Sequence, residues 1–267
     1  MLQNDVEIRT ATFGENPLKL PSTLNRGYEN MLLKSEIIHG DCLEIMKKLP
    51  DNCIDLVLTD PPYLYKNLVG GGCNQLTKTI TKSFEDLKDI RDGISLEFCK
   101  EVLRLQNKIN CYIWCSKEQI INYLNFFVTD NKCSYDILTW YKTNALPTFN
   151  NKYLTDKEYC LYFRKGGYCQ PDNYENAKTI FYEPINILDK KKFNHPTIKP
   201  LKIFERLIKN STKKGDWVLD CFSGSGTTAI ACNNLKRNFI CIEKDYKYWE
   251  ISVERLANAQ AQLNLFK

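Results

Sequence analysis

The sequence predicts an α/β protein in which a mostly parallel sheet carries helices on both faces. Two observations predict this class. From about residue 35 onward, short apolar segments typical of strands alternate with segments that have helical spacing. Two of the apolar segments also end in unusual turns, one at Asp60-Pro61-Pro62-Tyr63 and one that is rich in glycine near residue 224. Ligands of such sheets bind beyond the carboxyl ends of the strands, so both turns are candidate sites.

Local patterns predict the elements before residue 165. The spacing of Leu43, Met46 and Leu49 predicts a helix that stops at Pro50. Two segments rich in aromatic residues predict a pair of strands joined by a loop. The expected strands are residues 35–39, 54–59, 110–115, 135–142 and 158–163, and the expected helices are residues 42–49, 95–105 and 118–127.

The rest of the chain repeats the alternation of strand and helix. An amphipathic pattern predicts a helix at residues 200–208, followed by strands at 217–220 and 238–242 and helices at 227–235 and 246–263. Three segments show no such pattern: residues 1–34, which are polar, 64–93 and 166–194. We therefore expect an N-terminal arm at 1–34 and one domain at 35–267 with two long connections, since loops of this length are usually functional or disordered.

The composition is that of an ordinary globular protein, with 267 residues of which 43% are hydrophobic and 26% charged. No segment is apolar for long enough to span a membrane, and the first ten residues do not resemble a signal peptide. We expect a soluble cytoplasmic protein with no membrane partner. The net charge of +5 is compatible with a nucleic-acid partner. The run Lys190-Lys191-Lys192 would contact phosphates, or it is plain solvated surface.

Twelve cysteines form no metal-binding pattern. The chain contains no Cys-x-x-Cys, and Cys111 and Cys115 have no second pair or nearby histidine to complete a zinc site. Only two histidines are present, His39 and His195. We expect no metal site, and thiols that act as small hydrophobic side chains in a reducing compartment.

The glycine-rich turn predicts a cofactor site. It joins an apolar strand to a helix, so glycine lets the backbone approach a ligand and the helix start offers free N–H groups. Glu243, at the end of the next strand, can accept hydrogen bonds from ribose hydroxyls. A Gly-x-Gly-x-x-Ala pattern could also mark a dinucleotide site, but too few residues follow Glu243 for a second winding half. We therefore expect a cofactor of the mononucleoside type; a tight turn without a ligand is the alternative.

The Asp-Pro-Pro-Tyr turn predicts a site for an amine on a flat base. Two prolines force the chain to leave the strand in an extended, rigid conformation. The Asp60 carboxylate, the Pro61 carbonyl and the Tyr63 ring then form a preset array. The two acceptors suit the N–H groups of an exocyclic amine, and the ring suits stacking on the base. A proline-stiffened loop without a ligand is the alternative.

Taken in order, three motifs give a family resemblance. Asp-Pro-Pro-Tyr at residues 60–63, His-Pro-Thr-Ile-Lys-Pro at 195–200 and Phe-x-Gly-x-Gly-Thr-Thr at 222–228 resemble the β-group of amino-type DNA methyltransferases, which modify adenine N6 or cytosine N4. The resemblance covers about residues 35–260. It implies a Rossmann-like class I methyltransferase fold with a seven-stranded sheet and a circularly permuted motif order. It also implies S-adenosylmethionine as cofactor and double-stranded DNA as partner.

The resemblance also assigns residues to roles. Asp60, Pro61, Pro62 and Tyr63 would be catalytic: the Asp60 carboxylate and Pro61 carbonyl orient the amine, and Tyr63 stacks on a flipped base. The residues that would bind the cofactor are Asp41, Lys199, Pro200, Phe222, Gly224, Ser225, Gly226, Thr227, Thr228 and Glu243. Residues 140–144 match a variable segment near the target base, although Trp140 and Tyr141 also suit a core. The segments 64–93 and 166–194 would contact DNA.

Several alternatives stay open at this point. Adenine N6 is favoured because Asp at position 60 accompanies adenine more often than cytosine in such enzymes; relatives acting on cytosine N4 more often carry Ser there. More distant Pro-Pro-Tyr methyltransferases act on RNA or on a protein glutamine, and they more often show Asn and the opposite motif order. A DNA-binding subunit without catalytic activity is a different class of function. A homodimer and a cognate restriction endonuclease remain candidate partners.

Overall fold

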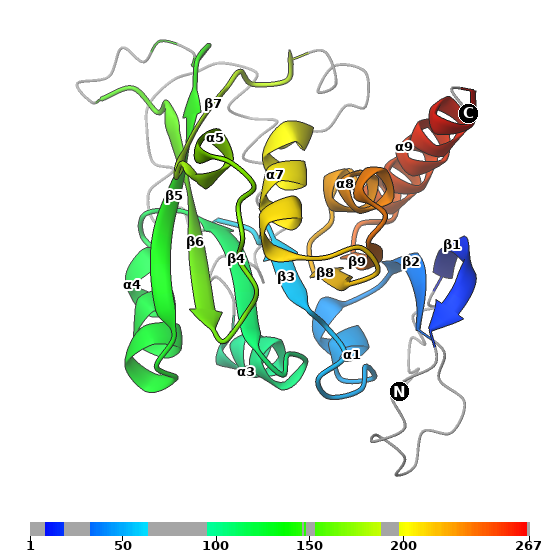
Figure 1. Ribbon diagram of the computed structural model, residues 1–267, viewed down its shortest axis with the longest axis horizontal. Helices are drawn as coiled ribbons and strands as arrows, with labels where there is room; N and C mark the ends of the chain where they lie inside the picture. Colours follow the sequence, from blue (N-terminus) through cyan, green and yellow to red (C-terminus); the bar gives the residue numbers. More distant parts are fainter. Residues whose placement is uncertain are drawn as a thin grey trace, which may run out of the picture.

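The computed structural model describes residues 9–18, 33–63, 95–145, 147, 153–187 and 198–265. In this part of the chain nine strands form one sheet, in the order β1-β2-β9-β8-β3-β4-β6-β5-β7 (Figure 1). The strands are β1 (Arg9–Leu18), β2 (Leu33–His39), β3 (Leu56–Thr59), β4 (Ile109–Cys115), β5 (Ser134–Lys142), β6 (Lys157–Lys165), β7 (Ile180–Glu183), β8 (Trp217–Asp220) and β9 (Asn238–Glu243). The helices are α1 (Cys42–Met46), α3 (Leu96–Arg104), α4 (Ile120–Tyr123), the π-helical segment η3 (Leu124–Asp130), α5 (Tyr174–Ala177), α7 (Leu201–Ser211), α8 (Thr227–Leu235) and α9 (Tyr246–Leu265).

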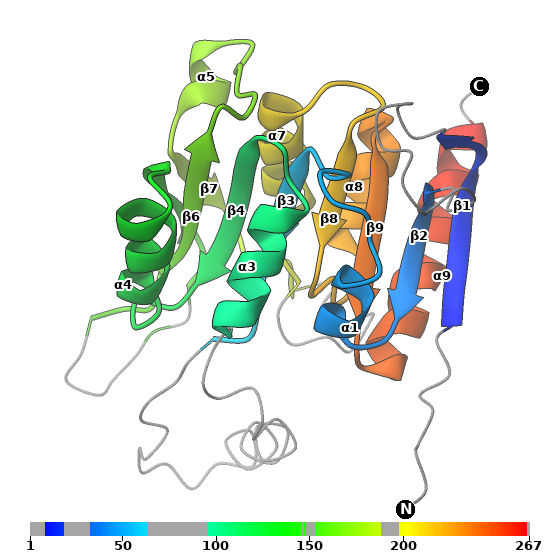
Figure 2. The ribbon, with the colours of Figure 1, turned by 90° about the horizontal axis from the view of Figure 1, so that it is seen from below.

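Helices cover both faces of the sheet, as the sequence predicts (Figure 2). Helices α1, α3 and α4 pack on one face, and α7, α8 and α9 pack on the other. Strand β3 shows the reason, because successive side chains of a strand point to opposite faces. Val57 enters the core beneath α1 and α3, whereas Leu56 and Leu58 enter the core beneath α7 and α8, and all three are fully buried. Residues 56–58 of this strand are all apolar because their side chains fill the cores on both faces of the sheet.

The centre of the sheet is parallel, which sets the position of the site. The neighbours β2, β9, β8, β3 and β4 all run in the same direction. Strand β6 runs opposite to both β4 and β5, and β1 runs opposite to β2. The carboxyl ends of the five central strands consequently lie side by side along one end of the sheet, which we call its carboxyl edge. The prediction of a mostly parallel sheet is confirmed.

The number of strands is nine rather than the predicted seven. Strand β1 comes from the segment expected to be an extended arm, and it pairs antiparallel with β2 at one edge of the sheet. Strand β7 lies in the segment 166–194, which showed no pattern, and it pairs in parallel with β5 at the other edge. Edge strands pair on one side only and carry exposed side chains. Their sequences therefore lack the strong apolar signal of central strands.

Two helices also differ from the predicted ranges. The helix expected at 118–127 is a short α4 that continues as η3. There the Asn131 backbone N–H donates to the carbonyl of Phe126, five residues earlier, and the Asn131 side-chain amide donates to the same oxygen at 2.8 Å. The side-chain bond gives the wider turn a second donor. Helix α1 ends at Met46 rather than at residue 49, and single-turn bonds complete the segment to Leu49.

The described part of the chain holds neither a membrane span nor a metal cluster. No helix in the described ranges is long and apolar enough to cross a membrane. Within the same ranges, His, Cys, Asp and Glu side chains form no group of three that could hold a metal ion. The cysteines there are free thiols. Burial raises the pKa of Cys42 and of Cys115 to about 12, so neither thiol is a ready nucleophile near neutral pH.

Candidate active site

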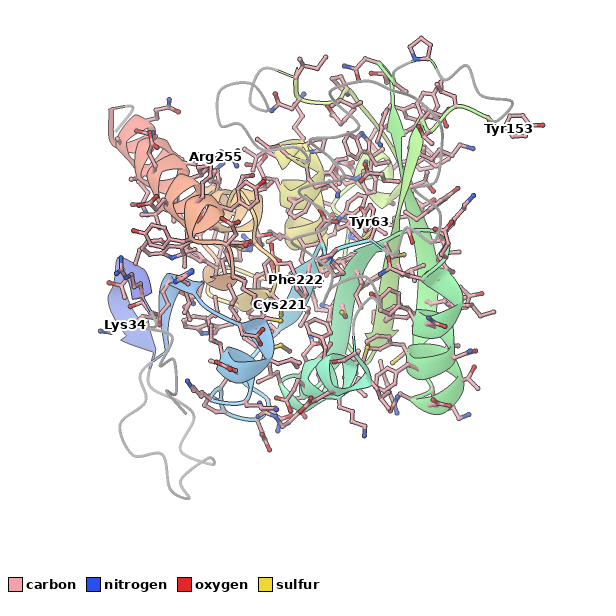
Figure 3. The ribbon with its side chains drawn as sticks, turned by 180° about the vertical axis from the view of Figure 1, so that it is seen from behind. Lys34, Tyr63, Tyr153, Cys221, Phe222 and Arg255 are labelled. Carbon is pink, nitrogen blue, oxygen red and sulfur yellow. The ribbon has the colours of Figure 1, made fainter. Side chains whose placement is uncertain are left out.

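The site is built from the carboxyl ends of four parallel strands. Strand β3 runs into Asp60, β8 into the glycine-rich turn, β9 ends in Glu243, and β2 leads to Asp41. The backbone N–H of Gly40 donates to the carbonyl of Glu243 at 3.0 Å, which ties two of these ends together. The structure thus brings the two turns singled out in the sequence to one edge of the sheet. Tyr63 and Phe222, one from each turn, both lie toward the centre of this edge (Figure 3).

Glycine is required in the turn after β8. Gly226 has a φ of +79°, in the left-handed region that favours glycine. A Cβ atom on Gly226 would also lie 2.8 Å from the Cβ of Ser252 in α9. Helix α8 begins at the next residue, Thr227, so its first N–H groups face the turn. The hydroxyl oxygen of Ser223, within the turn, is buried and has no hydrogen-bond partner among the described residues.

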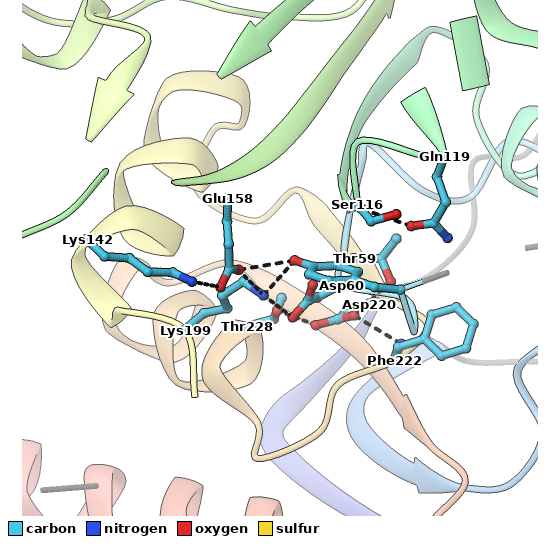
Figure 4. Close-up of polar contacts among 11 residues, drawn as sticks. Thr59, Asp60, Ser116, Gln119, Lys142, Glu158, Lys199, Asp220, Phe222 and Thr228 are labelled. Carbon is cyan, nitrogen blue, oxygen red and sulfur yellow. Dashed lines mark hydrogen bonds and ion pairs between the residues drawn. The ribbon is translucent and has the colours of Figure 1, made fainter. Parts of the chain in front are cut away.

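Asp220 joins the two turns. Its carboxylate accepts hydrogen bonds from the Thr59 hydroxyl at 3.1 Å, from the Phe222 backbone N–H at 3.1 Å and from the Thr228 hydroxyl (Figure 4). Thr59 is the last residue of β3, so this carboxylate fixes the Asp-Pro-Pro-Tyr turn against the glycine-rich turn. Burial raises the pKa of Asp220 to about 6 despite these hydrogen bonds. Asp220 was not among the predicted site residues, and Thr228 holds this carboxylate as well as lying in the expected cofactor pocket.

Glu243 has the environment of a ligand-binding carboxylate. One oxygen accepts the backbone N–H of Gly224 at 2.7 Å and the other accepts that of Asp245 at 2.8 Å. Burial raises its pKa to about 7, although both backbone bonds oppose that shift. Each oxygen has a further lone pair that a hydroxyl could use. The geometry therefore fits a nucleoside cofactor, whose ribose hydroxyls would find acceptors beside a backbone that glycine leaves accessible.

Asp41 is engaged in local structure. It is the N-cap of α1, and its carboxylate accepts the Leu43 N–H at 3.0 Å and the Glu44 N–H at 3.4 Å. Its second oxygen lies 3.3 Å from the ammonium of Lys244. The cap explains why an acidic residue stands at this position whatever its contact with a cofactor. Its assignment to the cofactor stays a prediction, as do those of the other residues expected to bind the cofactor.

The rest of the glycine-rich turn is held from behind by α9. The Ser225 hydroxyl and carbonyl both accept from the guanidinium of Arg255, with 2.8 Å between the Arg255 nitrogen and the Ser225 Oγ. Pro200 is the N-cap of α7, and its ring begins the helix without a side-chain cap. The ring of Phe222 lies 5.7 Å from that of Phe98 in α3. The contacts of Arg255 and Phe98 hold the glycine-rich turn in place, but neither of them identifies a ligand.

The Asp-Pro-Pro-Tyr turn holds a free acceptor. One Asp60 oxygen, Oδ2, is 2.5 Å from the ammonium of Lys199, whereas the other, Oδ1, is buried without a hydrogen-bond partner in the described part of the chain. The turn is tied at its far end, because Gln119 donates to the Pro62 carbonyl at 3.2 Å and accepts the Ser116 N–H at 2.9 Å. A buried acceptor normally has a partner. The orphaned Oδ1 is therefore available to a donor group of a ligand.

Lys199, which the family resemblance assigns to the cofactor, lies at the Asp-Pro-Pro-Tyr turn in this structure. Its ammonium lies 3.1 Å from the Tyr63 hydroxyl and 3.0 Å from an oxygen of Glu158 (Figure 4). Glu158, at the start of β6, also accepts from the Tyr63 hydroxyl and from Lys142 of β5. Neither Glu158 nor Lys142 was predicted from the sequence. The sequence signal that could have found Glu158 is that it is the single acidic residue in the aromatic-rich strand β6.

The protonation of this cluster follows from burial and pairing. Burial raises the pKa of Asp60, and the ammonium of Lys199 only partly offsets that rise. Burial also raises the pKa of Glu158, but the two neighbouring ammonium groups outweigh it and bring the value down to about 2. Burial lowers the pKa of Lys199, and its two carboxylate partners more than reverse this effect. Near neutral pH the Lys199 ammonium and the Glu158 carboxylate are charged.

Other predicted contacts are placed less favourably or lie outside the described residues. Trp140 is only 2% exposed, and its indole N–H donates to the Glu183 carbonyl at 2.7 Å, so it is a core residue. The Tyr141 ring meets that of Tyr182 edge-on at 5.6 Å. His195, the 190–192 lysine run and the segment 64–93 lie outside the described ranges.

Comparisons with known proteins agree on one family. A sequence model of the N6/N4 methyltransferases, described as DNA methylase, matches residues 54–254. Type II methyltransferase M2.MboI of Moraxella bovis is 32% identical over 238 residues, which cover 82% of this chain and 86% of that protein. Type II methyltransferase M2.LlaDCHI of Lactococcus lactis subsp. cremoris is 31% identical and covers 82% of this chain and 88% of its own.

Solved structures give the same result. The crystal structure of an M1.HpyAVI–SAM complex matches with a TM-score of 0.60 at 30% identity, and covers 82% of this chain and 98% of that one. The PvuII DNA methyltransferase, named as cytosine-N4-specific, matches with a TM-score of 0.61 over 85% of this chain and 91% of its own. It is only 18% identical, so this second likeness shows the fold alone.

Proposed function

This chain belongs to the N6/N4 DNA methylase family, and on that premise we propose that it moves a methyl group from S-adenosylmethionine to N6 of an adenine in double-stranded DNA. The family name covers adenine and cytosine amines alike. The observation that carries the proposal is the buried, unpartnered Oδ1 of Asp60 beside the ring of Tyr63. A carboxylate accepts strongly from an amine and tolerates the positive charge that develops on it.

The chain's own residues would hold the cofactor at the glycine-rich turn. When bound, S-adenosylmethionine supplies a methyl group that is activated by a positively charged sulfur. Glu243 accepts the ribose hydroxyls, and the turn from Phe222 to Thr228, which includes Gly224, Ser225, Gly226 and Thr227, lines the pocket. The unpartnered Ser223 hydroxyl gives this pocket a further polar contact. The first N–H groups of α8 add donors at the same place.

Asp60, Pro61 and Tyr63 would act on the amine. Its lone pair is delocalised into the base, so the free amine is a poor nucleophile. Asp60 Oδ1 and the Pro61 carbonyl accept its two N–H groups and favour the geometry in which the lone pair points at the methyl carbon. The cofactor would supply the methyl group and keep the electron pair of its broken C–S bond. The proton that the amine gives up would leave through its hydrogen bond to Asp60 Oδ1 and pass to water. The gain comes from positioning and electrostatics, without a covalent enzyme intermediate.

We further propose how the chain meets DNA. A base inside a duplex cannot reach this edge, so it would be rotated out of the stack and placed on Tyr63. The single domain from residue 35 would contact the duplex through the segments 64–93 and 166–194. The type II class is taken from the names of the relatives, and it makes a cognate restriction endonuclease the expected functional partner. A homodimer is the other candidate assembly.

The test is direct. The protein is incubated with methyl-labelled S-adenosylmethionine and duplex DNA, and the DNA is digested to nucleosides. We expect label in N6-methyladenine. Label in N4-methylcytosine alone would mean that the target base is cytosine and not adenine, and it would leave the assignments of fold and cofactor unchanged. An absence of label together with tight DNA binding would support a non-catalytic subunit.

A further inference from the structure

Four charged side chains form an alternating line behind the Asp-Pro-Pro-Tyr turn. Lys142 lies 2.7 Å from Glu158, Glu158 lies 3.0 Å from Lys199, and Lys199 lies 2.5 Å from Asp60 (Figure 4). Lys142 lies in β5 and Glu158 in β6, whereas Lys199 lies two residues before α7 and Asp60 directly follows β3. The line therefore joins segments that are distant in the sequence. Their side chains are between 6% and 20% exposed. Charges this poorly solvated interact strongly, and each depends on its neighbours.

Glu158 is the branching point of this line. One of its oxygens accepts from Lys142, and the other meets both the Lys199 ammonium and the Tyr63 hydroxyl, at 3.0 Å and 3.1 Å. Lys199 in turn occupies Oδ2 of Asp60 and leaves Oδ1 free. The orientation of the Asp60 carboxylate and the position of the Tyr63 ring therefore both depend on the same glutamate.

We infer that Glu158 is a positioning residue for methyl transfer: it holds Lys199 and Tyr63 so that one chosen oxygen of Asp60 faces the target amine. The inference rests on the proposed role of Asp60. Without the glutamate, Lys199 would have Asp60 as its single carboxylate partner and could bridge both oxygens. Oδ1 would then be a weaker acceptor for the amine, and the Tyr63 hydroxyl would no longer be held by Glu158.

The charge of Glu158 gives the inference a pH signature. The groups that influence the pKa of Asp60 are Lys199 before α7, Glu158 on β6 and Tyr63 on the same turn. Asp60 also faces Asp220 on β8, Cys115 on β4 and Cys160 on β6. Among these, the Glu158 carboxylate raises the pKa of Asp60 and Lys199 lowers it. Removing the negative charge should lower the Asp60 pKa in two ways, because one repulsion disappears and Lys199 no longer divides its charge between two carboxylates.

The experiment compares Glu158→Gln with Glu101→Gln in the full chain. Glu101 is 15% exposed and also pairs with a cation, Arg104, but it lies on α3 outside the site. In single-turnover methyl transfer at saturating cofactor and DNA, Glu158→Gln should be about 10- to 100-fold slower, as expected when a reacting group is misplaced. The acid limb of its rate profile should move to lower pH. Its cofactor affinity should stay within about threefold of wild type, and Glu101→Gln should match wild type throughout.

A second readout does not depend on activity. The buried Lys199 ammonium should give a protected signal in 1H–15N spectra, assigned by its loss in Lys199→Met, and Glu158→Gln should broaden that signal. If Glu158→Gln does not fold, Glu158→Asp keeps the charge and shortens the reach, and should slow the reaction less while leaving the acid limb in place. A folded variant with the wild-type rate and acid limb would overturn the inference. A wild-type protein that labels no DNA would instead overturn the proposed function.

Discussion

At the residue scale, Asp60 is expected to act on the amine and not on the cofactor. Replacing it with Ala should abolish methyl transfer, because the buried acceptor Oδ1 is removed where charge develops. Cofactor affinity should stay within about tenfold of wild type. Asp136→Ala, which removes an exposed carboxylate from β5, serves as the control and should leave the rate unchanged. Rapid turnover by a folded Asp60→Ala protein would remove Asp60 from catalysis.

Glu243 should make cofactor binding depend on pH. Its pKa of about 7 in the free protein means that the carboxyl group is mostly protonated at pH 6 and ionised at pH 8. Ribose hydroxyls donate more strongly to the ionised form, so affinity should rise through pH 7. Glu243→Gln should bind more weakly, by about 1.5–3 kcal/mol at pH 8, and should lose the pH dependence. Calorimetry across this range is the measurement, with the exposed Glu250→Gln as control.

The same raised pKa links Glu243 to folding, and the sign is opposite to that of an ordinary ion-paired acid. The folded pKa of about 7 lies above the unfolded value near 4.5, so the protonated form favours the folded state. Its contribution to the free energy of unfolding is present below pH 4.5 and is lost as pH rises through 7. Wild-type affinity that is flat across pH 6 to 8 would contradict the ribose assignment and leave this folding effect intact.

At the scale of single elements, Gly226 in the turn before α8 and Gly215 just before β8 form a matched pair of glycines. Gly226 and Gly215 both have positive φ, +79° and +87°. A Cβ on Gly226 would meet Ser252 at 2.8 Å, whereas one on Gly215 would meet nothing within 4 Å. Each Ala variant should lose about 1–3 kcal/mol of unfolding free energy from backbone strain. Gly226→Ala should lose more, and it alone should weaken cofactor binding; equal losses in urea unfolding would rule out the contact.

The elements that the sequence predicts best are those with two independent local signals. Strand β8 and helix α8 match their predicted ranges, because an apolar run and the glycine-rich turn that follows it agree there. Strands β1 and β7 were missed because edge strands need little apolar surface. Helix α4 differs because the Asn131 side chain, invisible to periodicity, supports a wider turn.

The residues of the candidate site also differ in whether a local sequence signal predicts them. The acceptor at Asp60 and the turn at Gly226 are marked by a motif and by glycine. Glu158 and Lys142 are not, because their importance comes from pairing with Lys199, which only the folded sheet brings near. Tertiary ion pairs leave no spacing in the sequence. Lys199 shows the intermediate case, since its motif was found but its partner was not.

At the scale of the whole molecule, the net charge of +5 favours association with DNA and predicts strong salt dependence. Phosphate contacts release counterions, so the logarithm of the affinity should fall linearly with the logarithm of the salt concentration. The run Lys190-Lys191-Lys192 lies beside the motif at 195–200 in the sequence but outside the described residues. Its role as a phosphate contact therefore stays a prediction.

Changing these three lysines to Gln should flatten the salt dependence, by about 0.9 in log–log slope for each DNA phosphate that the protein no longer neutralises. The matched control changes Lys108, Lys132 and Lys165, which lie next to the other ends of β4, β5 and β6, at the edge of the sheet opposite the site. Both variants have three fewer positive charges, so any effect of net charge alone is common to them. A larger change of slope for the 190–192 variant would show that this run contacts DNA phosphates. Equal slopes in the two variants would mean that the run is plain surface and that DNA is held by other segments.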